Sequence, residues 1–249
     1  MPTAVLAARW WWYVRDRPRE HRSLVAAELA EIEPEPRATT GPRVSWAEVG
    51  RMLSDRNVLL LSLGYLLMNY VFYFFNQWSF LYLVEERHLT LLASGWLASI
   101  PLLVGAACAT IGGLMCGAAC ARLGARWGFR IIPLIVLPLS AALLLVAARV
   151  EDPYVAVAAL AGCFGCVQMT EASFWGATFW AARERASAAT GVLNMGGNLG
   201  GIIGTPIVAH LAQAQNWPGA LATGVAFALA SAALWLFIDV ERRPTGAAR

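Results

Sequence analysis

Polar side chains inside otherwise apolar stretches are the residues of this sequence that could do chemistry. Steps of three and four residues place Tyr65, Asn69, Tyr73 and Asn76 along one face of a helix. Each such group costs free energy in hydrocarbon unless it faces protein or water. The pattern predicts a water-filled path that binds a solute through hydroxyl and amide groups. Hydrogen bonds between neighbouring helices are the alternative interpretation.

Glu171 is the only acidic residue deep in any of the apolar stretches. A carboxylate at the centre of a membrane helix costs about 2.5–3.5 kcal/mol, so this group must be protonated, paired or hydrated. Such a side chain is suited to carry a proton in a coupled transporter. A structural carboxylic acid that bonds a backbone carbonyl is the alternative. Trp175 lies four residues further on, one helical turn away.

A glycine-rich stretch runs over residues 191–204 and ends before Pro206. Its G-x-x-x-G pairs allow close approach of helices in a bilayer, and glycine together with proline makes a helix that bends, as a moving gate requires. Asn194 and Asn198 are one turn apart and present amides on one face. Tight packing alone is the alternative explanation for the glycines.

Other kinds of site have little support. His21, His88 and His210 are dispersed, and no phosphate-binding loop or Ser-His-Asp arrangement occurs. Cys163 and Cys166 form a C-x-x-C pair, but inside an apolar helix it indicates small-residue packing rather than redox chemistry. The arginines fall in short loops, so nucleic acid is not an expected partner. We therefore predict no enzyme, no metal and no cofactor.

The elements that must position these residues are membrane helices. Of the 249 residues, 58% are hydrophobic and only 14% are charged, against about a quarter charged in soluble domains. A bilayer core needs about twenty apolar residues per helix. Six stretches qualify, at about residues 57–83, 91–116, 131–148, 154–177, 186–211 and 218–238. The sequence therefore predicts an all-α polytopic membrane protein, held in a lipid bilayer.

Arginine placement predicts the domain organisation and the orientation. Residues 1–13 read as the end of a truncated membrane helix, with a surface anchor as the alternative, and residues 14–56 as a cytoplasmic linker. The six-helix domain covers residues 57–238, and residues 239–249 form a tail. Sixteen arginines fall on one side of the six spans and two on the other. Because basic residues stay cytoplasmic, we expect both ends of the domain on the cytoplasmic side of a bacterial inner membrane.

Four stretches resemble the C-terminal half of the anion:cation symporter family, within the major facilitator superfamily. Residues 13–18 look like the junction after the family's sixth helix, and residues 73–83 look like its seventh. Residues 171–175 resemble an E-G-x-F-W pattern of the tenth helix. Residues 191–201 are similar to the eleventh-helix pattern G-x-x-N-x-x-G-N-x-G-G.

The resemblance implies a six-helix half-bundle of the major facilitator fold, preceded by a clipped helix. It also implies symport of a small organic anion, such as a sugar acid or an aromatic carboxylate, with a proton or sodium. Two six-helix halves would rock around a midplane site. The family's cytoplasmic loop G-G-x-x-x-D-R corresponds to residues 112–118, where its Asp and Arg are replaced.

Five helices and most of a sixth that the family carries have no counterpart in this chain. We expect a truncated product, or a half-transporter that needs the missing N-terminal half or a partner subunit. A degenerate, non-transporting membrane protein is the alternative. By position in the family pattern, Tyr65, Trp175 and Asn194 line the cavity. The full predicted substrate site is Tyr65, Asn69, Tyr73, Asn76, Trp175, Asn194 and Asn198, with Glu171 coupling the proton.

Overall fold

A computed structural model describes residues 2–15, 20–21, 23–25, 27–29, 46–182 and 185–241 of the chain. The chain forms two compact units, Met1–Arg43 and Val44–Arg249. Helices make up nearly all of the described chain, which contains no strand. They are α1 (Pro2–Tyr13), α3 (Trp46–Ser54), α4 (Arg56–Gln77), α5 (Ser79–Glu85), α6 (Leu91–Arg149), α7 (Pro153–Met169), α8 (Glu171–Ala182), α9 (Ala186–Gln213) and α10 (Trp217–Leu234).

Short polar side chains cap the N-termini of α4, α7 and α10. The Asp55 carboxylate accepts hydrogen bonds from the backbone N–H groups of the first turn of α4, at 2.9 and 3.1 Å. Asp152 caps α7 in the same way, just before Pro153, and the amide oxygen of Asn216 caps α10. The first N–H groups of a helix have no partner within it, so these caps fix where each span starts.

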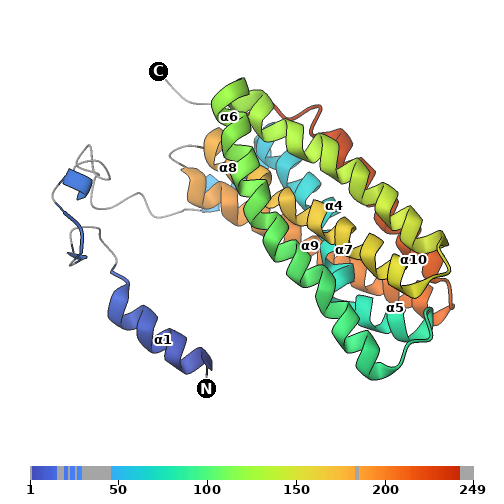
Figure 1. Cartoon of the computed structure of the whole chain (residues 1–249). Helices are drawn as coiled ribbons and strands as arrows, with labels where there is room; N and C mark the ends of the chain where they lie inside the picture. The colour runs from blue at the N-terminus through green and yellow to red at the C-terminus, as the bar shows by residue number, and fades with distance from the viewer. Residues whose placement is uncertain are drawn as a thin grey trace. The chain divides into compact units, whose positions relative to one another are not determined.

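The long helix α6 is two passes that reverse at one glycine. Its 59 residues would extend about 90 Å if straight, three times the thickness of a bilayer core. Gly124 has φ 75° and ψ 168°, a conformation that favours glycine, and a Cβ added to Gly128 would lie 2.4 Å from the Cα of Cys120. The chain on either side of Gly124 therefore runs back along itself, as the green to yellow-green ribbon in Figure 1 shows.

The described residues thus confirm the predicted all-α membrane protein. Five helical segments are long and apolar enough to cross a bilayer, and the reversal of α6 turns them into six passes. Two of the predicted spans are interrupted: Trp78 separates α4 from α5, and Thr170 separates α7 from α8. The prediction of a cytoplasmic loop at residues 112–118 is wrong. These residues are helical within α6, because the turn comes later, at Gly124.

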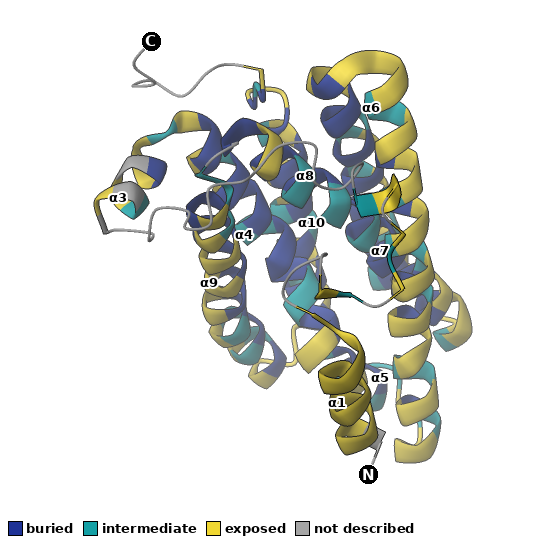
Figure 2. Cartoon of the chain, turned by 90° about the vertical axis from the view of Figure 1, so that its left-hand side faces the viewer, coloured by how far each residue is buried: buried dark blue, intermediate teal, exposed yellow. Residues whose placement is uncertain are grey.

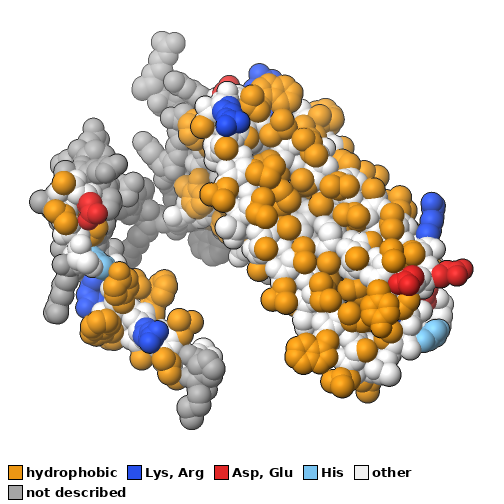
Figure 3. Space-filling view, viewed as in Figure 1, with side chains coloured by type: hydrophobic (Ala, Val, Ile, Leu, Met, Phe, Trp, Pro, Cys, Tyr) orange, Lys and Arg blue, Asp and Glu red, His pale blue; other side chains and the backbone are white. Residues whose placement is uncertain are grey.

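In the second unit, α4 is the central helix, with contacts to α9, α10, α8 and α7. Its inward side chains, such as Leu61 and Met68, are fully buried. Large apolar side chains remain exposed on the outer faces of α6 and α9 (Figure 2), and Leu103 and Ile202 are examples. In Figure 3 hydrophobic side chains cover the visible flank of this unit, while charged ones lie at its ends. This distribution suits a protein whose flank faces lipid.

Helices α1 and α3 differ in their surroundings. The described side chains of α1 are exposed along its whole length, and Trp11 is 86% exposed. At its end the guanidinium of Arg15 donates to the carbonyl oxygens of Trp11 and Val14. In α3, by contrast, Met52 is buried against Val58 and the first turns of α9. The structure therefore places α3 with the membrane domain.

Candidate substrate and proton site

Three of the predicted site residues form a closed triangle of hydrogen bonds. The hydroxyl of Tyr65 donates to Oε2 of Glu171 at 3.1 Å. The indole N–H of Trp175 is shared between the same Oε2, at 3.0 Å, and the Tyr65 hydroxyl oxygen, at 3.3 Å. Two donors thus converge on one carboxylate oxygen inside the bundle. Glu171 is therefore hydrogen-bonded by two neutral donors, which offsets part of the cost of a carboxyl group in hydrocarbon.

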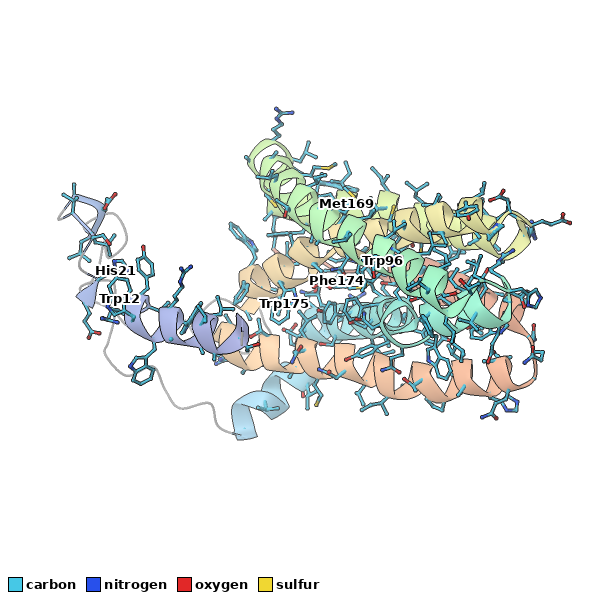
Figure 4. The ribbon with its side chains drawn as sticks, turned by 60° about the horizontal axis from the view of Figure 1, so that its bottom comes forward. Trp12, His21, Trp96, Met169, Phe174 and Trp175 are labelled. Carbon is cyan, nitrogen blue, oxygen red and sulfur yellow. The ribbon has the colours of Figure 1, made fainter. Side chains whose placement is uncertain are left out.

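The break between α7 and α8 sets the position of the carboxylate. Glu171 is the first residue of α8, directly after Thr170. Trp175 follows one turn later on the same helix, so spacing alone brings its ring beside the carboxylate. Next to it, Phe174 packs edge-on against Trp235 of the last turns after α10, with ring centroids 4.9 Å apart. Figure 4 shows Met169, Phe174 and Trp175 within the bundle, around this break.

Tyr65 reaches the carboxylate because α4 and α8 lie close together. Gly64, its neighbour in α4, faces the ring of Phe174, and a Cβ there would lie 3.2 Å from Cε1 of that ring. The carbonyl oxygen of Gly64 also accepts a hydrogen bond from Ser231 of α10, at 2.8 Å. The backbone of α4 at Gly64 is therefore in contact with both α8 and α10, and these contacts fix the position of Tyr65 relative to Glu171.

The glycines of α9 form a tight seam with α4. A Cβ at Gly196 would lie 2.6 Å from the carbonyl oxygen of Ser62, and one at Gly200 would lie 2.3 Å from that of Leu66. Gly197 abuts the ring of Tyr65, and the seam continues through Gly201 and Gly204. Helix α9 runs without interruption through Pro206. The packing interpretation therefore accounts for these glycines, whereas bending at this stretch stays a prediction.

The remaining predicted residues form one pair between helices, two amides that bond within their own helix and one exposed amide. The Tyr73 hydroxyl donates to Oδ1 of Asn198 at 3.1 Å, joining α4 to α9 further along the seam. The amides of Asn69 and Asn76 each donate to the backbone carbonyl four residues earlier, in their own helix. Asn194 is exposed on α9. The predicted stripe on α4 thus includes a triangle, a cross-helix pair and two locally bonded amides.

Sequence reasoning missed the hydrogen bond between Gln77 and Thr205, at the end of the α4–α9 seam. The hydroxyl of Thr205 donates to Oε1 of Gln77 at 2.7 Å, so it closes the α4–α9 seam at its far end. Gln77 lies four residues after Tyr73 and so fits the spacing of the predicted stripe, but it was not included in the predicted site, and Thr205 is next to a proline in the chain. A signal was nevertheless present, because both are polar residues near the ends of apolar stretches that must pack on each other.

With this geometry established, the chain can be compared with known proteins. The sequence profile described as "Major Facilitator Superfamily" matches residues 104–249, more than half of the chain. The chain belongs to the Major Facilitator Superfamily. This superfamily membership confirms the predicted facilitator half-bundle, and it assigns the chain to membrane transport proteins rather than to enzymes.

The chain is also similar to proteins that are named as transporters of sugar acids. The chain is 26% identical, over 96% of its length, to the probable galactarate/D-glucarate transporter GarP of Escherichia coli K12. It is 25% identical, over 94% of its length, to the probable galactarate/D-glucarate transporter GudP of Bacillus subtilis 168. It is also 25% identical to a hexuronate transporter of Bacillus subtilis 168, over 97% of its length. These matches cover 56%, 53% and 57% of the relatives, so the chain spans about half their length.

Proposed function

We propose that this facilitator chain forms the C-terminal half of a secondary transporter for sugar-acid anions, driven by a proton gradient. The triangle of Tyr65, Glu171 and Trp175 is the observation that carries the proposal. It joins α4 to α8 through a carboxyl group, which can gain and lose a proton within the bundle. The relatives named for galactarate, D-glucarate and hexuronate support the substrate class.

In this proposal, amides and hydroxyls around the triangle bind the hydroxyl-rich anion. Exposed Asn76, Asn194 and Asn198 offer donors and acceptors beside the α4–α9 seam. Rocking of two six-helix halves around a midplane site provides alternating access in such transporters. The second half comes from a longer chain or from a partner subunit. The arginine bias supports an inner-membrane location with both ends of the six-helix domain in the cytoplasm.

Uptake into proteoliposomes tests the proposal, with the complete transporter that contains this half. An imposed proton gradient should drive accumulation of galactarate or glucarate. The variant Glu171→Gln should lose accumulation but keep exchange of labelled for unlabelled substrate, because exchange needs no net proton movement. Glu151→Gln, which removes an exposed carboxylate from the α6–α7 turn, is the matched control.

Each result decides one part of the proposal. Full accumulation by Glu171→Gln would contradict the proton role, and a sodium gradient that replaces the proton gradient would contradict the coupling ion. If the wild type moves no carboxylate, the non-transporting alternative holds. The mass and N-terminal sequence of the native protein show whether the second half lies in the same chain. A mass about twice 26.9 kDa is expected for two joined six-helix halves.

A further inference from the structure

The first pass of α6 and the α7–α8 segment run side by side in one constant register. The Sγ of Cys108 lies 2.9 Å from where a Cβ on Gly165 would be. Four residues further along α6, Gly112 meets the backbone of Met169. Four residues further again, Sγ of Cys116 accepts a hydrogen bond from the Ser173 hydroxyl at 3.7 Å. The partners in each pair are 57 positions apart, so α6 keeps the same register across the break at Thr170.

Gly112 is the closest of these approaches. A Cβ at this position would lie 2.4 Å from the carbonyl oxygen of Met169, 2.5 Å from its Cα and 2.8 Å from its carbonyl carbon. These are backbone atoms, which cannot rotate away as a side chain can. Gly113, the next residue, has nothing within 4 Å of its Cβ position. Of these two neighbouring glycines, only Gly112 is at a position where a side chain would clash.

The backbone of Met169 is also where α7 ends and α8 is set. The Thr170 hydroxyl donates to the carbonyl oxygen of Val167 at 2.7 Å. The Thr170 carbonyl oxygen accepts from the N–H groups of Ser173 and Phe174, at 3.0 and 3.1 Å. These bonds start a new helix at Glu171, two residues beyond the point that touches Gly112. A displacement of Met169 would therefore be passed to the carboxylate.

We propose that Gly112 is a positioning residue for Glu171. The proposal rests on the proton role proposed above and adds what holds the carboxyl group in place. Because it has no side chain, Gly112 lets the end of α7 lie against α6. This contact sets the position of Glu171 relative to Tyr65 of α4. A methyl group at Gly112 pushes the break away from α6 and moves the start of α8 relative to α4, so the hydrogen bond from Tyr65 to Oε2 lengthens or breaks.

The surroundings of Glu171 make this effect measurable through its protonation. Tyr65 is the titratable side chain that reaches it from α4. From α6, the thiol of Cys116 bonds to Ser173 two residues further along, and α9 presents Gly197 to the Tyr65 ring. No ion pair to Glu171 occurs within residues 46–182 and 185–241. Loss of the Tyr65 donor, which comes from a different helix, is therefore the change that its titration reports.

Carbodiimide modification of Glu171 at a series of pH values, measured by mass spectrometry on the purified full chain, tests the proposal. Tyr65→Phe removes one donor directly and gives the reference shift. Gly112→Ala should shift the pH of half-modification in the same direction, by about one pH unit, the size expected when a charged group loses one hydrogen bond. Gly113→Ala should overlay the wild-type profile.

A Gly112→Ala protein that melts at lower temperature but keeps the wild-type pH profile would overturn the proposal, because the glycine would then serve packing alone. Should this variant fail to fold, Thr170→Val replaces it. It removes the hydroxyl bond to Val167 at nearly constant volume and should give the same shift, whereas an unchanged profile overturns the proposal. The modification needs no transport, so failure of the Glu171→Gln uptake test would remove the proton role and leave the positioning result intact.

Discussion

At the scale of single residues, the triangle concentrates two hydrogen-bond donors on one oxygen of Glu171. Oε2 receives both the Tyr65 hydroxyl and the Trp175 indole N–H. The donors differ in origin, since Trp175 belongs to the same helix as Glu171 and Tyr65 to α4. A change at Tyr65 therefore alters the link between helices, whereas a change at Trp175 alters the carboxylate within its own helix.

The variant Tyr65→Phe isolates that link. A hydrogen bond to a charged group contributes about 1.5–3 kcal/mol, and each 1.4 kcal/mol is a factor of ten in rate, so gradient-driven uptake should fall about tenfold or more. The measurement is initial uptake of labelled glucarate by the complete transporter. Tyr70→Phe is the control, because the Tyr70 hydroxyl bonds Thr223 of α10 at 2.6 Å, away from the triangle. Equal uptake by the two variants would remove Tyr65 from the site.

At the scale of elements, the seam between α4 and α9 depends on glycine. Gly200→Ala would place a methyl group against the carbonyl oxygen of Leu66, whereas Gly191 has open space around it. Overpacking costs about 1–3 kcal/mol, so Gly200→Ala should lower the melting temperature by about 2–12 °C. Gly191→Ala should hold or raise it, because alanine is the better helix former by about 1 kcal/mol. Thermal unfolding in detergent compares them, and equal stabilities would contradict the seam.

A second link between elements is made by Arg87, in the α5–α6 turn. Its Nε donates to the Tyr82 hydroxyl at 2.8 Å, and its guanidinium donates to the carbonyl oxygens of Ala147 and Val150 at the end of α6. A cation placed there also complements the negative end of that helix. Arg87 is thereby used structurally, which explains an arginine on the side of the membrane that has few.

Replacing Arg87 by lysine keeps the charge and removes the planar fork of donors. We expect Arg87→Lys to cost about 1–3 kcal/mol of stability, because two helix-end carbonyls lose their donors. Arg149→Lys, a change at an exposed arginine near the same helix end, should leave the melting temperature unchanged. A stable Arg87→Lys protein would show that the charge, not the fork, is what this turn requires.

The limits of sequence reasoning are seen in the same elements. Hydropathy predicts the membrane passes, because a run of about twenty mostly apolar residues is the length that a helix needs to cross a bilayer. The breaks at Trp78 and Thr170 carry no proline or glycine, and the second arises where the Met169 backbone meets Gly112 of another helix. In the site, helical spacing predicts that Trp175 lies beside Glu171. That Tyr65 joins them depends on the contact of α4 with α8, which no local pattern contains.

At the scale of the whole molecule, six passes place alternate turns on opposite sides of the bilayer. The reversal at Gly124 lies at one end of the passes, and the α6–α7 turn at Glu151 and Asp152 lies at the other. All sixteen arginines of the basic side lie within residues 15–56, 122–130, 183–185 and 242–249, which are the segments that the helix order places on the same side as the Gly124 reversal. The charge asymmetry and the helix order therefore indicate the same orientation. The basic side is expected in the cytoplasm.

Cysteine accessibility tests this orientation. In a chain whose five native cysteines are replaced by alanine or serine, Arg122→Cys probes the α6 reversal and Glu151→Cys probes the opposite turn; both positions are exposed. A membrane-impermeant maleimide added to intact cells should modify Glu151→Cys only, because the basic turn faces inward. Opening the cells should expose Arg122→Cys as well. Labelling of Arg122→Cys in intact cells would reverse the orientation, and labelling of both would show that the α6 hairpin does not cross the membrane.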